Sequence, residues 1–158
     1  MSLDRSFRVY VAASASPDEA PRVASAIAAL RAHGFVVTCT WPEVVAATGD
    51  ANPRDASNVD RRGWSTSDLN EIDAADALWF LVPNPPAMTR GAWFEAGYAY
   101  SSHKHLVFSG DTKQSVFCAL GIEFAGDAAA LAHLIHLRDA YAPAANGLEH
   151  LFDVGGEG

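Results

Sequence analysis

Positive charge is scarce in this chain of 158 residues. It carries 11 Lys and Arg against 19 Asp and Glu, which gives a net charge of −8 at pH 7. Proteins that bind duplex DNA depend on clustered Lys and Arg to neutralise phosphates. We therefore expect no nucleic-acid polymer as a partner, although one phosphate held locally is compatible with this balance.

Cysteines and long apolar runs are also few. Cys39 and Cys118 lie far apart in apolar surroundings and predict buried, reduced thiols rather than a disulfide framework. No apolar run approaches the roughly 20 residues of a membrane span. The N-terminus lacks the basic region and apolar stretch of a signal peptide. These features predict a cytoplasmic protein that does not bind a membrane.

Several sequence motifs that would indicate a cofactor are missing. The chain has no Walker loop, dinucleotide-binding fingerprint, zinc pattern or serine nucleophile elbow. His133 and His136 are three apart on a predicted helix, but no third ligand stands at metal-binding spacing. We therefore predict no metal and no cofactor.

Strand-like and helix-like segments alternate along the chain. Short β-prone runs predict strands at residues 7–12, 35–40, 77–82, 105–109 and 121–125. Helical patterns lie between them, beginning with a helix that Ser16 and Glu19 would cap. The pattern predicts one α/β domain over residues 7–140, followed by a tail, 141–158. The expected fold is three-layered and doubly wound, with a mostly parallel sheet of about five strands, as in flavodoxin-like and Rossmann-like proteins.

Residues 41–63 are predicted to be a long polar loop. Such a loop inside a compact domain either covers a functional site or is a surface segment, and both alternatives stay open. Its cations, Arg54, Arg61 and Arg62, could meet a phosphate, but solvated arginines are more common.

The most informative stretch runs from Asp73 to Tyr100. The apolar run Ala77–Val82 predicts a strand buried on both faces, and a helix follows over 89–100. Glu95 stands in that helix among apolar neighbours, just past the carboxyl end of a strand, where ligands bind in open α/β sheets. It is either a functional carboxylate or a capping or supporting one. Tyr98 either orients Glu95 by a hydrogen bond or only packs.

A second acid, Asp68, is predicted at the same edge of the sheet. Ser65 or Ser67 would cap its helix, which places Asp68 in the first turn. An acid there can simply match the helix dipole. With Glu95 at the same edge, a functional role is favoured.

Three segments together resemble the nucleoside 2-deoxyribosyltransferase family, which includes nucleotide N-glycoside hydrolases. They are Phe7-Arg8-Val9-Tyr10-Val11-Ala12, Asp68-Leu69-Asn70-Glu71-Ile72 and Gly91-Ala92-Trp93-Phe94-Glu95-Ala96-Gly97-Tyr98-Ala99. The resemblance covers about residues 7–135. It implies chemistry at an N-glycosidic bond, with Glu95 acting at the anomeric carbon, Asp68 near the base and Tyr10 beside Glu95. It also implies a homo-oligomer in which a neighbour's tail closes the site.

The chain departs from the family pattern at two places. Thr89 stands where the transferases carry a sugar-holding acid, and the loop after the first strand is Ala12-Ala13-Ser14-Ala15-Ser16 instead of Gly/Pro-rich. In the nucleotide-hydrolysing branch a hydroxyl at the Thr89 position helps to hold a 5′-phosphate. Thr89, Arg90, Gly91, Tyr98 and Ser14 are therefore the candidate substrate-binding residues.

Three hypotheses follow for function. The first is an enzyme that cleaves or exchanges the N-glycosidic bond of a nucleoside or a nucleoside 5′-monophosphate. The second is a nucleotide-binding or sensor module of the same fold without catalysis. The third is a structural domain with no small-molecule site. The sequence does not identify the base or distinguish ribose from deoxyribose.

Overall fold

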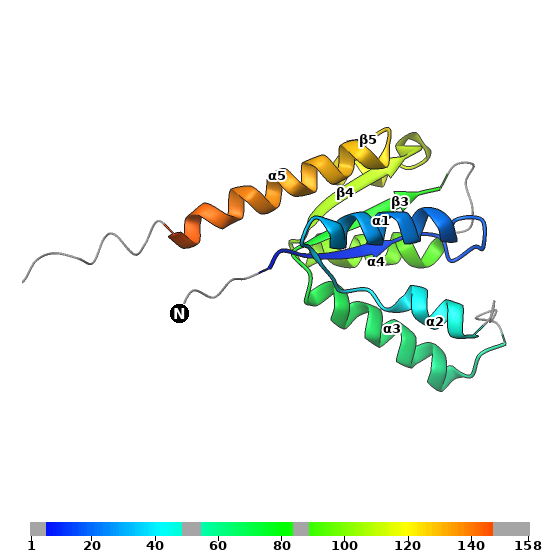
Figure 1. Cartoon of the computed structure of the whole chain (residues 1–158). Coiled ribbons are helices and arrows are strands. Elements are labelled where there is room, and N and C mark those ends of the chain that lie inside the picture. The colour runs from blue at the N-terminus through cyan, green and yellow to red at the C-terminus, as the bar shows by residue number, and fades with distance from the viewer. Residues whose placement is uncertain (1–5, 49–54, 84–88, 147–158) are drawn as a thin grey trace, which may run out of the picture.

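Five parallel strands form the single sheet in the computed structural model, which describes residues 6–48, 55–83 and 89–146 (Figure 1). The strands are β1 (Arg8–Ala12), β2 (Val36–Val37), β3 (Ala77–Val82), β4 (His105–Gly110) and β5 (Ile122–Phe124). Their spatial order is β2-β1-β3-β4-β5, and every neighbouring pair is parallel. The predicted fold class is confirmed.

Helices cover both faces of the sheet. They are α1 (Ala20–Ala32), α2 (Trp41–Thr48), α3 (Asn58–Asp73), α4 (Arg90–Ser101) and α5 (Asp127–Asn146), with short 3₁₀ helices η1 (Thr112–Gln114) and η2 (Val116–Leu120) before β5. Helices α1 and α5 pack together on one face, and α3 and α4 pack together on the other (Figure 1). The sheet is therefore the middle of three layers.

The centre of the core is β3. All six of its residues are buried, as the uninterrupted apolar run predicts for a strand covered on both faces. Its neighbour β1 is buried from Val9 to Ala12. Because side chains alternate along a strand, β1 and β3 each send some residues toward α1 and α5 and others toward α3 and α4.

The segment after β2 differs from the prediction. Residues 41–48 form the helix α2 and residues 58–63 belong to α3, so the predicted loop 41–63 is wrong over most of its described length. Strand β2 covers only Val36–Val37 of the predicted strand 35–40. Beyond it, the Glu71 carboxylate accepts hydrogen bonds from the backbone N–H (3.0 Å) and the hydroxyl (2.5 Å) of Thr40. Backbone N–H groups of the new helix then donate to the Thr40 carbonyl.

The start of α3 was also predicted wrongly. The helix begins at Asn58, and its cap is Ser57, whose hydroxyl accepts a hydrogen bond from the backbone N–H of Asp60 at 3.0 Å. Neither Ser65 nor Ser67 caps it. Similarly, α1 begins at Ala20 with Glu19 at its N-cap, so the expected cap at Ser16 does not form. Helix α5 continues past residue 140 to Asn146.

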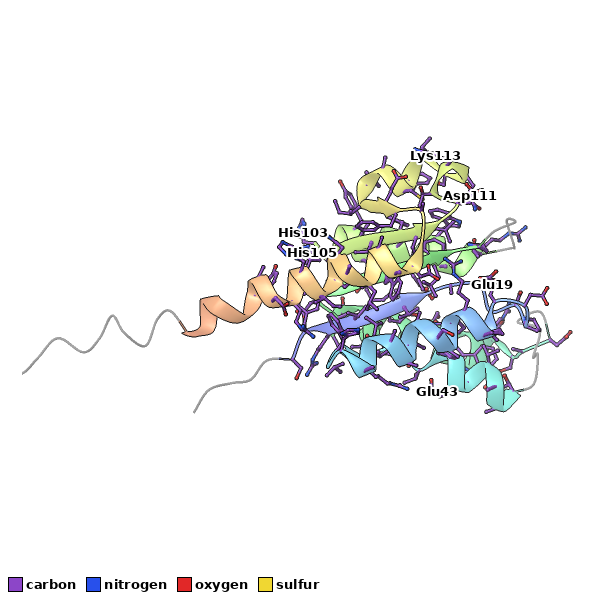
Figure 2. All side chains as sticks on the ribbon, turned by 45° about the horizontal axis from the view of Figure 1, so that its top comes forward. Glu19, Glu43, His103, His105, Asp111 and Lys113 are labelled. Atoms are coloured by element: carbon purple, nitrogen blue, oxygen red, sulfur yellow. The ribbon has the colours of Figure 1, made fainter. Side chains whose placement is uncertain are left out.

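A polar network fixes the carboxyl ends of β3 and β4. The Arg22 guanidinium donates to the carbonyls of Val82 (2.8 Å) and Ser109 (3.1 Å) and binds both carboxylate oxygens of Asp127. The Ser109 hydroxyl donates to Asp127 and accepts from the indole of buried Trp79. This network joins α1 and α5 to the edge of the sheet where Glu19 and Asp111 also lie, opposite His103 and His105 (Figure 2).

Gly110 ends β4 inside this network and provides a test of it. Its φ is +110°, and a Cβ there would lie 2.3 Å from the Val82 carbonyl oxygen and 3.1 Å from Arg22. Replacing Gly110 with Ala should lower the free energy of unfolding by about 2–4 kcal/mol, measured by urea denaturation. Gly126→Ala is the control, since nothing lies within 4 Å of its Cβ position. Equal stability of the two variants would contradict this account of the strand ends.

Candidate active site

The sheet order creates a crevice between β1 and β3. From β1 the chain crosses to β2 on one side, and from β3 it crosses to β4 on the other side. The connecting segments separate at this topological switch point, where ligands of doubly wound proteins bind beyond the carboxyl ends of the strands. Tyr10 comes from β1, Asp68 from α3 and Glu95 from α4. The structure thus brings together the three residues that were predicted to be catalytic.

Tyr10 points toward the α3 and α4 face of the sheet. Its side chain is fully buried, and its hydroxyl oxygen makes no hydrogen bond of standard geometry to any described residue. The hydroxyl is nevertheless close enough to both carboxyl groups to lower the pKa of each. Burial, followed by the charges of Glu95 and Asp68, strongly raises the pKa of Tyr10 itself, so it remains a neutral donor. A buried phenol with an unused donor is suited to holding a carboxylate in place.

Glu95 lies in the second turn of α4 and is partly buried. Burial, followed by the charge of Asp68, raises its pKa from an ordinary 4.5 to about 7, while the Tyr10 hydroxyl acts in the opposite direction. A carboxyl group with this pKa exchanges its proton near neutrality. That property is typical of acid–base and nucleophilic groups in enzymes.

Asp68 lies in the third turn of α3, because that helix begins ten residues earlier than Asp68, at Asn58. The predicted first-turn position of Asp68 is therefore wrong, and the alternative that Asp68 only matches the helix dipole no longer applies. Burial and the charge of Glu71 raise the pKa of Asp68 to about 6, and the Tyr10 hydroxyl lowers it. Two carboxyl groups with raised pKa values thus share one site.

Glu71 is a third acid near the site, and the sequence analysis assigned it no role. Its carboxylate is bound to Thr40, as described above, and its charge raises the pKa of both Asp68 and Glu95. The spacing contained a signal for this, since residues three apart on a helix share a face, and Glu71 follows Asp68 by three. Glu71 both anchors the start of α2 and makes the site more negative.

The candidate substrate-binding residues occupy different places around the edge. Thr89 is buried at the N-cap of α4 and makes no capping hydrogen bond, while Arg90 and Gly91 are exposed in the first turn. Ser14 is buried just beyond β1, where its hydroxyl accepts from the Ser16 backbone N–H at 3.2 Å. The helix start and the loop after β1 therefore border the carboxyl edge, as expected.

Tyr98 does not orient Glu95. Its hydroxyl donates to the carboxylate of Asp73, with both oxygens at 3.0 Å, at the end of α3. Tyr98 and Asp73 thus connect α4 to α3. Trp93 packs in the core against Phe80 and Phe108, at ring-centroid distances of 4.6 and 6.3 Å.

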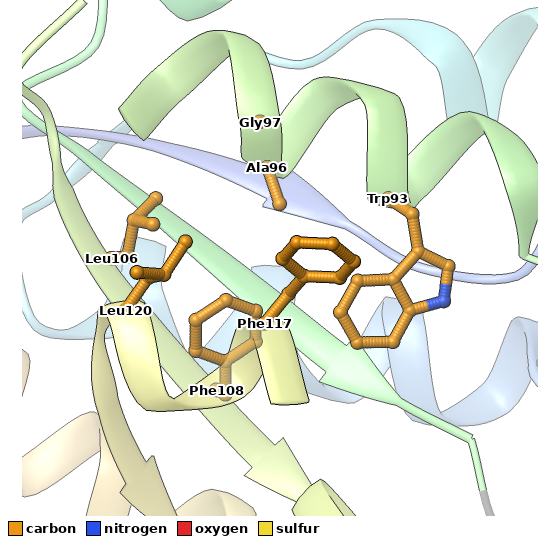
Figure 3. A pocket seen from close by; sticks show the side chains of 7 residues that line it. All are labelled: Trp93, Ala96, Gly97, Leu106, Phe108, Phe117 and Leu120. Carbon is orange, nitrogen blue, oxygen red and sulfur yellow. The ribbon is translucent and has the colours of Figure 1, made fainter. Parts of the chain in front are cut away.

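Two cavities flank the carboxyl groups without including them. One of about 450 Å³ lies between α1 and α2 and is bordered by Ser14. The other, of about 220 Å³, lies between α4 and η2 (Figure 3). Neither is lined by Glu95 or Asp68. Within the described ranges, no group of three or more His, Cys, Asp or Glu side chains is arranged to hold a metal ion.

Comparison with known proteins identifies the family of this chain. The family model described as nucleoside 2-deoxyribosyltransferase matches residues 9–143. This match covers most of the chain, so the chain belongs to the nucleoside 2-deoxyribosyltransferase family. No protein with a curated description matches the sequence.

Three solved structures share the fold. The 2-deoxyribosyltransferase of Bacillus psychrosaccharolyticus aligns at a TM-score of 0.62 and 17% identity, covering 80% of this chain and 95% of that one. A conserved protein from Enterococcus faecalis V583 gives 0.60 and 15%, covering 84% and 99%. The CMP N-glycosidase of Clostridium botulinum gives 0.51 and 17%, covering 80% and 97%. In the part of this chain that the structure describes, no helix is long and apolar enough to cross a membrane.

The raised pKa of Glu95 predicts how stability depends on pH. The folded state holds the proton more tightly than the unfolded state, so this group's contribution to stability is full below pH 4.5 and is lost as pH rises to about 7. Glu95→Gln removes the buried charge and should raise the free energy of unfolding on the order of 2 kcal/mol at pH 8, with little change at pH 4.

Denaturant unfolding at both pH values measures this difference. The matched control is Glu43→Gln on α2, which removes an exposed carboxylate and should change stability little at either pH. A destabilised Glu95→Gln variant at pH 8 would show that the Glu95 carboxylate is not held in a desolvated place.

Proposed function

We propose that this protein cleaves or transfers the N-glycosidic bond of a nucleoside or nucleoside 5′-monophosphate. The single observation that carries the proposal is the pair of partly buried carboxyl groups, Glu95 and Asp68, beside the Tyr10 hydroxyl at the switch point of the sheet. Membership of the family supports the reaction class. The bacterial transferase and the CMP N-glycosidase of the same fold are named for two versions of this chemistry.

The proposed roles follow from the charge that develops in the reaction. When the bond between the anomeric carbon and the base nitrogen breaks, its electron pair leaves with the base, and the sugar gains oxocarbenium character. Ionised Glu95 acts at the anomeric carbon, either as a nucleophile or as the base that takes a proton from water. Asp68 donates a proton or a strong hydrogen bond to the departing base. Tyr10 holds Glu95 in place.

We favour a nucleotide hydrolase over a nucleoside transferase. Thr89 replaces the sugar-holding acid of the transferases, and together with Arg90 and the amides near Gly91 it is suited to a 5′-phosphate at the start of α4. This start carries no acidic residue in its first turn, so no carboxylate of that turn repels an anion. We further propose that the protein is cytoplasmic and works as a homo-oligomer. The tail residues expected to reach a neighbour, Leu148, Leu151 and Phe152, lie outside the described residues.

A panel of nucleosides and 5′-nucleotides, with chromatography for free base, tests the proposal. The wild-type protein should release base from at least one member, and Glu95→Ala or Glu95→Gln should lower the rate by at least about 100-fold. Glu43→Gln, an exposed carboxylate on α2, should retain the wild-type rate. Full activity of both Glu95 variants would place the chemistry elsewhere.

The rate of base release should also show a bell-shaped dependence on pH. The proposed roles require Asp68 protonated and Glu95 ionised, which is the minor of the two singly protonated forms because the pKa of Glu95 is about 7 and that of Asp68 about 6. Since the pair must hold one proton in total, kcat/KM should still fall below about pH 6 and above about pH 7. Asp68→Asn retains a hydrogen-bond donor that does not titrate, and it should keep the acidic limb while losing the alkaline one. An unchanged bell in Asp68→Asn would exclude Asp68 as the proton donor.

The second candidate function is nucleotide binding without catalysis. Two observations favour it: Thr89 in place of the sugar-holding acid, and the absence of Glu95 and Asp68 from the linings of the two cavities. Such a module would bind a nucleotide in calorimetry without releasing base, and Glu95→Gln would leave its affinity unchanged.

A further inference from the structure

The proposed reaction needs the shared proton on one particular acid of the pair. Asp68 must carry it in order to donate to the departing base, while Glu95 must be ionised. The pKa of Asp68, about 6, is lower than that of Glu95, about 7, so a single shared proton is found mostly on Glu95. A neighbouring group that favours protonated Asp68 would therefore increase the reactive form of the enzyme.

Glu71 stands on the side of the pair where such a group is needed. It follows Asp68 by three residues on α3, so the two side chains share a face of that helix, with roughly 5–6 Å between their Cβ atoms. Glu95 belongs to a different helix, α4. After burial, the charge of Glu71 is the main reason for the raised pKa of Asp68. At Glu95 its effect is smaller than those of burial, Asp68 and Tyr10.

Hydrogen bonds hold the Glu71 carboxylate in place. One of its oxygens accepts from the backbone N–H of Thr40 at 3.0 Å, and the other accepts from the Thr40 hydroxyl at 2.5 Å. The Ser67 hydroxyl, one turn earlier on α3, donates to it at 3.3 Å. Within the described ranges, no Lys, Arg or His forms an ion pair with Glu71. The carboxylate therefore keeps its charge beside Asp68 without a neutralising partner.

The segment that binds Glu71 is itself fixed to the central part of the sheet. Trp41 follows Thr40, and its indole N–H donates to the backbone carbonyl of Val11 at 2.8 Å. Val11 is the next residue after Tyr10 on β1. The start of α2 is thus bound both to α3 and to β1, so Glu71 has a defined position relative to both acids.

The other titratable groups around the pair do not perform this task. The Tyr10 hydroxyl, from β1, lowers the pKa of both acids. Cys39 lies before α2, and burial raises the pKa of its thiol to about 12, so it is neutral. Glu43 of α2 pairs with Arg31 of α1 at 3.9 Å. Among the described residues, Glu71 is thus the charged group outside the pair that acts on Asp68.

We propose that Glu71 is a positioning residue for the proposed reaction, and that its carboxylate raises the share of molecules in which Asp68, and not Glu95, carries the proton. The proposal rests on the proposed function. In the step concerned, the bond between the anomeric carbon and the base nitrogen breaks, its electron pair leaves with the base, and the proton moves from Asp68 to the base. Glu71 neither gains nor loses a proton in this step, because it acts only through its charge on Asp68.

Glu71→Gln tests the proposal, since it removes the charge and keeps a side chain that can hydrogen-bond to Thr40. Carbon-13 NMR of the carboxyl groups should show the midpoint of Asp68 moving to lower pH by at least about half a pH unit, and that of Glu95 moving less. The bell of kcat/KM should move to lower pH as a whole. Its maximum should fall at least about twofold, because fewer molecules carry the proton on Asp68.

Two control variants separate the charge from the anchoring of α2. Thr40→Val removes a hydroxyl that binds Glu71 but retains the Glu71 charge, so the bell should keep its position on the pH axis. Glu43→Gln removes an exposed carboxylate of α2, and it should leave the midpoints of Asp68 and Glu95 unchanged.

Glu71→Ala decides the test if Glu71→Gln does not fold, as judged by circular dichroism. An unchanged midpoint of Asp68 would overturn the proposal, as would a bell that loses height without moving, because Glu71 would then only anchor α2. The midpoint of Asp68 does not depend on base release. A moved midpoint in a protein that releases base from no substrate would therefore support the effect of Glu71 on Asp68 and overturn only the proposed function.

Discussion

The proposed site depends on the free-energy cost of placing two carboxyl groups where water reaches them only in part. Glu95 and Asp68 come from different helices, α4 and α3, and both lie near the buried hydroxyl of Tyr10 on the strand β1. Burial disfavours their charged forms, so each holds its proton at a higher pH than an exposed acid does. A fold selected for stability alone has no need of such a pair. The same desolvation that costs stability produces groups that exchange protons near neutrality, as catalysis requires.

The scaffold holds this arrangement through contacts at both sides of the site. Arg22 binds the strand ends at Val82 and Ser109, and Asp127 fixes Arg22 in turn. On the other side, Glu71 anchors Thr40 at the start of α2, while Tyr98 joins α4 to α3 through Asp73. The order of the strands and the positions of the helices thus place the acidic side chains at the carboxyl edge of the sheet.

Part of the fold and part of the candidate site could be predicted from the sequence. The reason for success or failure differs from one element to the next. The run Ala77–Val82 could be read as a buried strand because hydrophobic burial on both faces leaves an uninterrupted apolar signature. The start of α3 could not be chosen securely, since Ser57 followed by Asp60 is as good a helix start as Ser65 to Asp68. Helix α2 was missed because glycine, proline and polar residues follow it closely, which concealed a short helical run. Glu95 and Asp68 were found through the family resemblance and their position near strand ends. The hydrogen-bond partners of Glu71 and Tyr98 could not be predicted, because they depend on how the helices pack and not on the neighbouring sequence.

The state of the Glu95 carboxyl group is the point that one experiment can settle. The side-chain carboxyl carbons can be labelled with carbon-13 and followed by NMR from pH 4 to pH 9, with Glu95→Gln used to assign the Glu95 signal. The account predicts a midpoint near pH 7 for Glu95, moving to lower pH in Asp68→Asn, where the neighbouring charge is absent. A midpoint near the ordinary value of 4.5, unchanged by Asp68→Asn, would contradict the claim that the two acids share a desolvated site.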